Sequence, residues 1–236
     1  MRFRDRTEAG RLLAARLAPW RGADVVILGL TRGGIPVAAQ VAAALGAPLE
    51  PIVVRKLGAP ACPEFAIGAI AECGAAYVDP DALLEAGLRD EDVEAIAERE
   101  CSALTRCVRL YRGGRPFPDL GGRTAIVVDD GVATGATARA AARSARKARA
   151  ARVVLASPVI AAESAPALRS DFDDVVAVEF PDPLLAVCVW YDSFGPVEDD
   201  EVLAILGRAR QPSGGAEAAD APRHGPVQPP GSPRGE

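Results

Sequence analysis

Thr124–Thr137 reads T-A-I-V-V-D-D-G-V-A-T-G-A-T, and the character of the fold follows from these residues. They begin with a nearly unbroken β-prone run that ends in two carboxylates, Asp129 and Asp130. A loop of small residues then leads into the helical pattern 138–151. The N-terminus of a helix offers free N–H groups and partial positive charge to an anion. Hydroxyls of Thr134 and Thr137 add donors, so the stretch predicts a site for a sugar phosphate. A buried strand followed by a solvated turn, with the acids capping the helix, is the simpler alternative.

Strand-like and helical patterns alternate around this stretch. Strands are predicted at 23–30, 49–55, 66–71, 75–78, 124–128, 152–158 and 174–180. An N-terminal helix is predicted because apolar residues from Ala9 to Trp20 lie on one helical face. Further helices are predicted at 36–45, 80–87, 90–111, 164–170 and 199–208. The segment 56–66 is expected to be an irregular loop. This alternation predicts a doubly wound α/β fold with a mostly parallel sheet. Ligands of such sheets bind outside the carboxyl ends of the strands.

Length and composition limit the classes of function. The chain has 236 residues, enough for one sizeable core, and a net charge of −5 that argues against nucleic-acid binding. Five cysteines without a C-x-x-C pair fit reduced thiols in the cytoplasm, and no apolar run is long enough to span a bilayer. The single histidine, His224, lies in a Pro/Gly-rich stretch, which excludes Ser-His-Asp and Cys-His hydrolase mechanisms. We expect a folded domain over 1–208 and a disordered tail over 209–236.

A second loop with anion-binding character follows the predicted strand 23–30. It reads Thr31-Arg32-Gly33-Gly34, a basic side chain followed by two glycines whose backbone can approach a ligand closely. A flexible turn with a surface arginine is the alternative. Arg55 and Lys56 follow the next predicted strand, where they are either a solvated edge or two cations that neutralise a phosphate. Both loops follow strand ends, so they can share one crevice.

Together these motifs resemble the type I phosphoribosyltransferase family. The run I-V-V-D-D-G-V-A-T-G-A-T is similar to the family's loop for 5-phosphoribosyl 1-pyrophosphate (PRPP), and R-G-G-I-P is similar to its pyrophosphate loop. The layout over 1–208 looks most like bacterial phosphoribosyltransferase-domain proteins that carry R-K-L-G-x-P and W-Y-x-x-F segments. The resemblance implies the type I fold with a small hood and a helical insertion. It also implies an Mg²⁺-dependent transferase that displaces pyrophosphate from PRPP with a nitrogen nucleophile.

The resemblance also assigns roles to residues. It places the ribose hydroxyls, directly or through Mg²⁺ and water, at Asp129 and Asp130. The 5′-phosphate is expected at Gly131, Val132, Ala133, Thr134, Gly135, Ala136 and Thr137. The pyrophosphate is expected at Thr31, Arg32, Gly33 and Gly34, helped by Arg55 and Lys56, with 58–64 as a flexible lid.

The acceptor is the least legible part of the sequence. The segment Val189–Phe194 is the best candidate for its site, through Trp190, Tyr191 and Asp192, although core packing explains the aromatic residues equally well.

We expect a cytoplasmic homo-oligomer, a dimer in the simplest case. A protein that senses PRPP or a nucleotide without turnover is the alternative function. It would use the basic stripe that starts at Arg139 and Arg143, for example to bind RNA. A phosphate-binding hydrolase is a third reading, disfavoured because the chain lacks a usable histidine.

Overall fold

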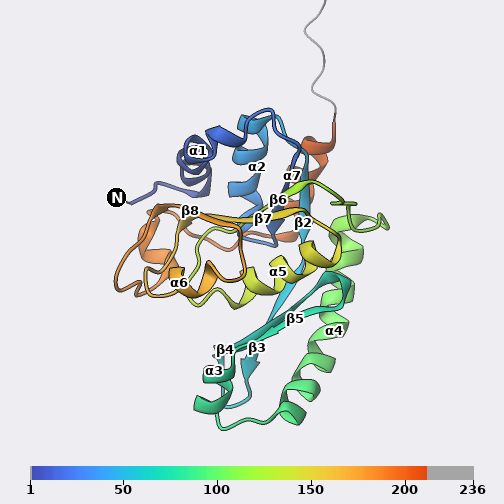
Figure 1. Cartoon of the computed structure of the whole chain (residues 1–236), viewed down its shortest axis with the longest axis vertical. Coiled ribbons are helices and arrows are strands. Elements are labelled where there is room, and N and C mark those ends of the chain that lie inside the picture. The colour runs from blue at the N-terminus through green and yellow to red at the C-terminus, as the bar shows by residue number, and fades with distance from the viewer. Residues whose placement is uncertain (1, 212–236) are drawn as a thin grey trace, which may run out of the picture.

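Residues 2–211 are described by the computed structural model of the chain, in which two sheets form the framework (Figure 1). One is parallel, with the strand order β2-β1-β6-β7-β8, and the other is antiparallel, with the order β3-β4-β5. The strands are β1 (Val25–Leu30), β2 (Leu49–Ile52), β3 (Val54–Ala59), β4 (Cys62–Ala71), β5 (Ala75–Val78), β6 (Thr124–Val128), β7 (Arg152–Val159) and β8 (Asp174–Glu179). The α-helices are α1 (Arg6–Arg16), α2 (Gly34–Leu45), α3 (Pro80–Glu85), α4 (Asp90–Arg112), α5 (Ala136–Lys147), α6 (Ala165–Leu168) and α7 (Asp199–Arg210). The predicted α/β fold with a mostly parallel sheet is confirmed.

Helices cover both faces of the parallel sheet. Figure 1 shows α1, α2 and α7 on one face and α5 and α6 on the other. Successive residues of a strand point to opposite faces, so Val25 and Ile27 of β1 pack with the first group and Val26 and Leu28 with the second. All six residues of β1 are buried, which explains its continuous apolar sequence.

The order of the parallel strands creates a switch point between β1 and β6. From β1 the chain crosses through α2 to β2 on one side, and from β6 it crosses through α5 to β7 and then β8 on the other. The loops that follow β1 and β6 therefore diverge from neighbouring strand ends. A crevice at such a point is the usual ligand site of a doubly wound sheet.

The predicted strand 49–55 is divided between two strands, β2 and β3, and the predicted loop 56–66 is wrong. The chain leaves the parallel sheet at Val53, so that β2 and β3 belong to different sheets, and the expected loop forms most of the β3–β4 hairpin. Register shifts lie between Leu57, Gly58 and Ala59. These irregularities disturb the alternation of buried and exposed residues by which a strand is recognised.

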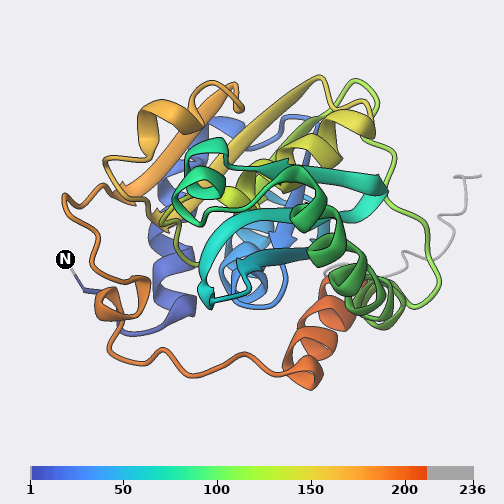
Figure 2. The same cartoon turned by 90° about the horizontal axis from the view of Figure 1, so that it is seen from below.

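The antiparallel sheet and its helices form the predicted insertion below the main sheet. β4 and β5 pair as the expected hairpin, with a short 3₁₀ turn at Glu72–Gly74 between them. Helices α3 and α4 pack on this sheet through a separate apolar cluster that includes Leu57, Ile67 and Ile96 (Figure 2). Helix α5 lies between the two sheets, because its alanine-rich face packs against β6 and β7 and also against β4 and β5.

The last predicted helix is longer than expected. Helix α7 continues to Arg210, two residues past the expected end at Arg208. Of the predicted tail 209–236, residues 209 and 210 belong to α7, and residues 212–236 lie outside the described residues. All five cysteines are free thiols, as the sequence led us to expect.

Candidate active site at the carboxyl ends of β1 and β6

The two predicted loops touch each other at the switch point. A Cβ atom added at Gly33 would lie 2.1 Å from Oδ2 of Asp130, and one added at Gly34 would lie 2.5 Å from the carbonyl oxygen of Val128. Contacts this short leave no room for a side chain on either residue. The glycines that follow β1 therefore let its loop lie directly against the acid pair that follows β6.

The acid pair is half-buried and internally hydrogen-bonded. The backbone N–H of Asp130 donates to Oδ1 of Asp129 over 2.9 Å. Burial, and then the neighbouring charge of Asp130, raise the pKa of Asp129 well above its usual value. A hydroxyl donor or a cation stabilises such a pair, because either one reduces the repulsion between the two carboxylates.

Arg6 is a member of the site that the sequence did not reveal. Its Nε lies 2.7 Å from Oδ2 of Asp130, and the exposed fractions of the two side chains are 13% and 14%. The two residues are 124 positions apart, and the N-terminal segment R-F-R-D-R contains three arginines without a local pattern that selects one. Only the packing of α1 beside the sheet identifies the pair.

The loop Gly131–Thr137 has the geometry of an anion site. Gly135 has a φ of +79° and immediately precedes α5, whose N-terminus has no side-chain cap within the described structure. Ala133 and Thr134 are exposed, and the Oγ–H of Ser164 donates to the carbonyl oxygen of Ala133 over 2.6 Å. The backbone N–H groups of the first helical turn are free of intrahelical partners, as at any helix start. They can bind a phosphate.

Close packing supports this loop from behind. A Cβ atom at Gly131 would lie 2.2 Å from Val187, and one at Gly135 would lie 2.6 Å from Leu168. The N–H of Val132 donates to the carbonyl oxygen of Val159 over 2.9 Å. The loop is thus held on its inner side, while Ala133 and Thr134 remain open to solvent.

Arg32 in the first loop is held by two carboxylates of the α7 start. Its Nη1 lies 3.7 Å from Glu198 and 3.6 Å from Asp199, and all three side chains are substantially exposed. Asp199 also accepts a hydrogen bond from the hydroxyl of Tyr111 over 2.6 Å. The peptide bond between Thr31 and Arg32 is cis. Exposed ion pairs of this kind are weak, so a phosphate can replace the carboxylates.

Arg55 and Lys56 lie on β3 rather than on a loop. Arg55 donates to Glu100 of α4 over 2.8 Å, and Lys56 lies 3.1 Å from Glu64 on β4. The structure thus gives both cations partners within the insertion. Their predicted role at the pyrophosphate stays a prediction.

The three predicted acceptor residues lie in three different environments. Tyr191 is buried, and its hydroxyl donates to the backbone oxygen of Asp130 over 2.5 Å. This hydrogen bond helps to hold the acid pair in place. Asp192 is exposed and lies 3.3 Å from Arg2. Trp190 is half-buried beside a hollow that it shares with Leu185 and Val189.

Several residues of the basic stripe on α5 make contacts within the molecule. The guanidinium groups of Arg139 and Arg143 lie 4.7 and 5.1 Å from the ring centre of Tyr77 on β5, and Arg139 is also 3.2 Å from Asp171. Lys147 donates to the carbonyl oxygen of Gly74 over 2.5 Å. These contacts tie α5 to the antiparallel sheet, while Arg143, Arg146, Lys147 and Arg149 stay exposed.

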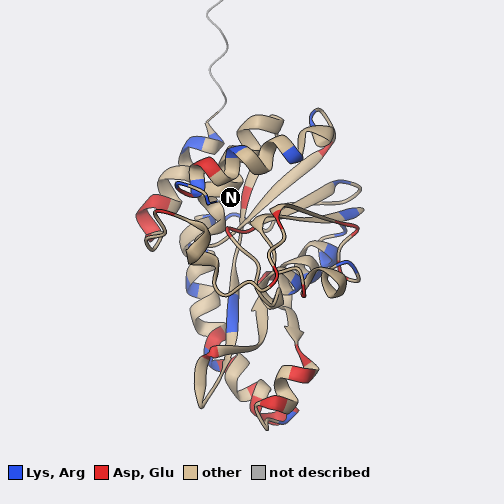
Figure 3. Cartoon of the chain, turned by 90° about the vertical axis from the view of Figure 1, so that its left-hand side faces the viewer, with Lys and Arg blue, Asp and Glu red and all other residues tan. Residues whose placement is uncertain are grey.

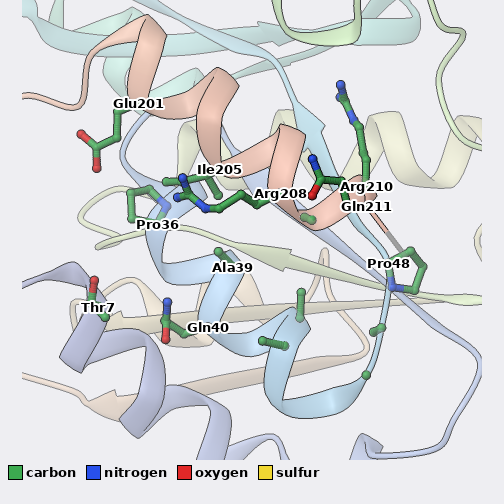
Figure 4. A pocket seen from close by; sticks show the side chains of 15 residues that line it. Thr7, Pro36, Ala39, Gln40, Pro48, Glu201, Ile205, Arg208, Arg210 and Gln211 are labelled. Carbon is green, nitrogen blue, oxygen red and sulfur yellow. The ribbon is translucent and has the colours of Figure 1, made fainter. Parts of the chain in front are cut away.

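The described residues also form a hollow and an acidic region that lie apart from the candidate active site. A hollow of about 770 Å³ lies between α2 and α7, with Gln40, Glu201 and Arg208 in its wall, and it contains none of the predicted site residues (Figure 4). Acidic residues gather at the far end of the insertion, on α3 and the first turn of α4 (Figure 3).

Within residues 2–211 no helix has the length and apolar character needed to cross a membrane. The same residues contain no cluster of three or more metal-ligating His, Cys, Asp or Glu side chains.

Comparison with known proteins identifies the family. The model of the family described as "Phosphoribosyl transferase domain" matches residues 6–186. The chain is 43% identical over 226 residues to the Mycobacterium tuberculosis H37Rv protein named "Putative phosphoribosyl transferase Rv0571c", and the match covers 96% of this chain. It covers 51% of that relative, so the chain spans about half the length of the curated relatives it matches. The crystal structure of TT1426 from Thermus thermophilus is also 43% identical, with a TM-score of 0.73 over 87% of this chain and 98% of that one. The paired loops at the switch point and these similarities lead to one conclusion: the chain belongs to the phosphoribosyl transferase domain family.

Proposed function

We propose that this chain is an Mg²⁺-dependent phosphoribosyltransferase that uses PRPP and releases pyrophosphate as a nitrogen acceptor bonds to C1 of the ribose. The contact between the Gly33 backbone and the Asp130 carboxylate carries the proposal. It brings the loop Thr31–Gly34 against the acid pair, directly after which the loop Gly131–Thr137 begins. PRPP has the matching order of groups, with a phosphate at one end, a pyrophosphate at the other and two ribose hydroxyls between them.

Each part of the substrate has a partner in this arrangement. The 5′-phosphate accepts hydrogen bonds from the N–H groups at the start of α5 and from the hydroxyls of Thr134 and Thr137. The ribose hydroxyls donate to Asp129 and Asp130. The backbone of 31–34 approaches the pyrophosphate, and Arg32 exchanges its carboxylate partners for phosphate oxygens.

The reaction then depends on electrostatics and positioning. As the bond from C1 to the pyrophosphate breaks, positive charge develops on the ribose and negative charge on the leaving group. The carboxylates lie on the ribose side, while Arg32 and the loop N–H groups lie on the pyrophosphate side. Fixed charges of this kind stabilise a transition state without reorganising.

Mg²⁺ fits the donors that the site provides. Asp129 and Asp130 offer hard carboxylate oxygens, which this ion prefers, and two carboxylates leave most of its ligands to PRPP and water. When bound, Mg²⁺ would neutralise part of the charge on the departing pyrophosphate.

The acceptor is best accommodated by the segment after β8. Leu185 and Val189 are exposed to 84% and 49%, and with Trp190 they line a hollow on the segment that contacts Gly131 through Val187. We propose that an acceptor with an apolar or aromatic face packs there. Tyr191 supports the acid pair instead of stacking on the acceptor. The expected dimer stays a prediction.

A thermal-shift experiment tests the use of PRPP. PRPP with Mg²⁺ should raise the melting temperature of the wild-type protein, since a ligand at a hundred times its Kd adds about 2.7 kcal/mol of stability. The double variant Asp129→Asn/Asp130→Asn should lose this shift. Asp119→Asn removes an exposed acid that pairs with Arg149, and it should keep the shift. If millimolar PRPP does not stabilise the wild-type protein, the proposal is wrong.

Turnover needs a separate measurement. Nucleobases and related nitrogen compounds are screened for PRPP-dependent release of pyrophosphate, with the Asp129→Asn/Asp130→Asn variant as the blank. Release with one acceptor establishes the transferase. PRPP binding without release for any acceptor would favour the sensing protein over the enzyme.

A further inference from the structure

One guanidinium group joins three parts of the site. Nε of Arg6 contacts Oδ2 of Asp130 at 2.7 Å, and Nη1 donates to the backbone oxygen of Gly195 over 2.8 Å. Its central carbon lies 3.9 Å from the ring centre of Phe194. The group is thus fixed by an ion pair, a hydrogen bond and a cation–π contact. It links the acid pair to the segment that follows Trp190.

The N-terminal residues and this segment form one layer beside the acids, which we call the hood layer (residues 2–6 and 190–195). Phe3 and Tyr191 form a parallel bridge, and the N–H of Asp192 donates to the carbonyl oxygen of Phe3 over 2.8 Å. The ring of Tyr191 packs against those of Phe3 and Phe194, with centroids 5.3 and 4.8 Å apart. The hood layer contacts Asp130 twice, through the Tyr191 hydroxyl and through Arg6.

These contacts leave the two oxygens of Asp130 in different environments. Oδ2 is covered by Arg6 on one side and lies next to the Gly33 backbone on the other. Oδ1 is further from Gly33, at 3.2 Å from the position of an added Cβ against 2.1 Å for Oδ2. Arg6 and the Gly33 backbone thus both lie close to Oδ2, and the Arg6 contact fixes the orientation of the carboxylate.

We propose that Arg6 is a positioning residue, which holds Asp130 by Oδ2, fixes the orientation of this carboxylate for the ribose hydroxyls and couples the acid pair to the hood layer. The proposal rests on the proposed function, because it assigns the ribose to this acid pair. Arginine suits the role, since its planar fork can reach a carboxylate and a carbonyl at once, whereas the single ammonium group of lysine cannot hold the same geometry. Without Arg6 the half-buried carboxylate next to Asp129 loses its cation and its fixed orientation.

Calorimetric titration of PRPP with Mg²⁺ tests this role in five variants of the full chain. Arg6→Gln should weaken PRPP binding tenfold or more, and Arg6→Lys should fall between Arg6→Gln and the wild type. Arg11→Gln removes the same charge from an exposed position on α1 and should bind like the wild type. In the background of Asp130→Asn, Arg6→Gln should change the Kd less than twofold, because the carboxylate that Arg6 orients is absent. A Kd within twofold of the wild type for Arg6→Gln would overturn the proposal, and so would tighter binding.

Amide hydrogen exchange of the ligand-free protein gives a second, independent reading. Arg6→Gln should accelerate exchange in 129–131 and 191–195, while Arg11→Gln should leave both segments unchanged. Unchanged exchange in both segments for Arg6→Gln would overturn the proposal even if PRPP did not bind. Absence of PRPP binding by the wild-type protein would instead contradict the proposed function. The two failures are therefore distinguishable.

Discussion

Gly33 shows how a missing side chain shapes the candidate site. The space for its Cβ is taken by the Asp130 carboxylate, so Gly33→Ala must push either the loop or the acid out of place. We expect at least a tenfold loss in PRPP affinity, measured by calorimetry. Gly207→Ala is the matched control, because Gly207 is exposed in α7 with no atom within 4 Å of an added Cβ. That change should leave affinity intact and add about 0.5–1 kcal/mol of stability. Unaltered PRPP binding by Gly33→Ala would show that the two loops need not touch.

Residues of the site differ in how far the sequence could predict them. Asp129 and Asp130 are recognisable because they lie between a predicted strand and a glycine-rich helix start. Their role can therefore be predicted from the local sequence. Arg6 belongs to the same site through a contact across 124 residues, and no local pattern records it. Tyr191 was expected near the site, but only packing shows that its hydroxyl serves the backbone of Asp130. Side-chain partners are set by tertiary structure, which a single sequence does not display.

Helices and strands were predicted best where a single hydrophobic pattern runs through the whole segment. β1 and β6 are buried on both faces, and their apolar runs identify them directly. β3 was missed because its sequence V-R-K-L-G-A contains a bulge, and Gly58 lets the backbone of Pro63 come within 2.3 Å of an added Cβ. A glycine and prolines that resemble a loop in sequence serve here to bend a hairpin.

Asp173 connects three elements and gives the fold a pH dependence. Its Oδ2 accepts from the N–H of Val153 at the start of β7 and from Arg146 of α5, each over 2.6 Å. Partial burial opposes ionisation, but these two donors outweigh it and hold the pKa of Asp173 below its usual value. A lowered folded-state pKa contributes stability above the unfolded value, of about 3.9, and loses it as the pH falls through the folded value.

The Asp173→Asn variant should therefore be less stable than the wild type at pH 7, and the difference should shrink as the pH falls below about 4. Urea unfolding at a series of pH values measures it. Asp182→Asn, on the exposed segment after β8, is the control and should show no such trend. A stability difference for Asp173→Asn that is constant across this pH range would contradict the assignment.

The whole molecule depends on how the chain passes from one sheet to the other. At Val53 the backbone N–H donates to Oε1 of Glu72 over 2.9 Å, and the Val53 oxygen accepts from the Glu72 N–H over 3.2 Å. Arg112, at the end of α4, contacts Glu72 at 2.5 Å and donates to the oxygen of Pro51 over 2.7 Å. Alternation of strands and helices predicted the parallel sheet, but this crossing was not predictable, because its partners come from three distant segments.

Arg112→Leu should be among the most destabilising substitutions in the chain. Arg112 is 2% exposed and Glu72 is 6% exposed, so removing the guanidinium leaves a buried carboxylate without its cation. Losing one partner of a buried pair costs about 3–5 kcal/mol. Arg115→Leu is the control, since Arg115 is exposed and lies 3.4 Å from Glu50, and it should cost no more than about 1 kcal/mol. Urea unfolding measures both. If Glu72 and Arg112 hold the sheets together as one unit, Glu72→Leu/Arg112→Leu should recover much of the loss, because no buried charge then remains. Equal costs for Arg112→Leu and Arg115→Leu would show that the sheets are joined by apolar packing alone.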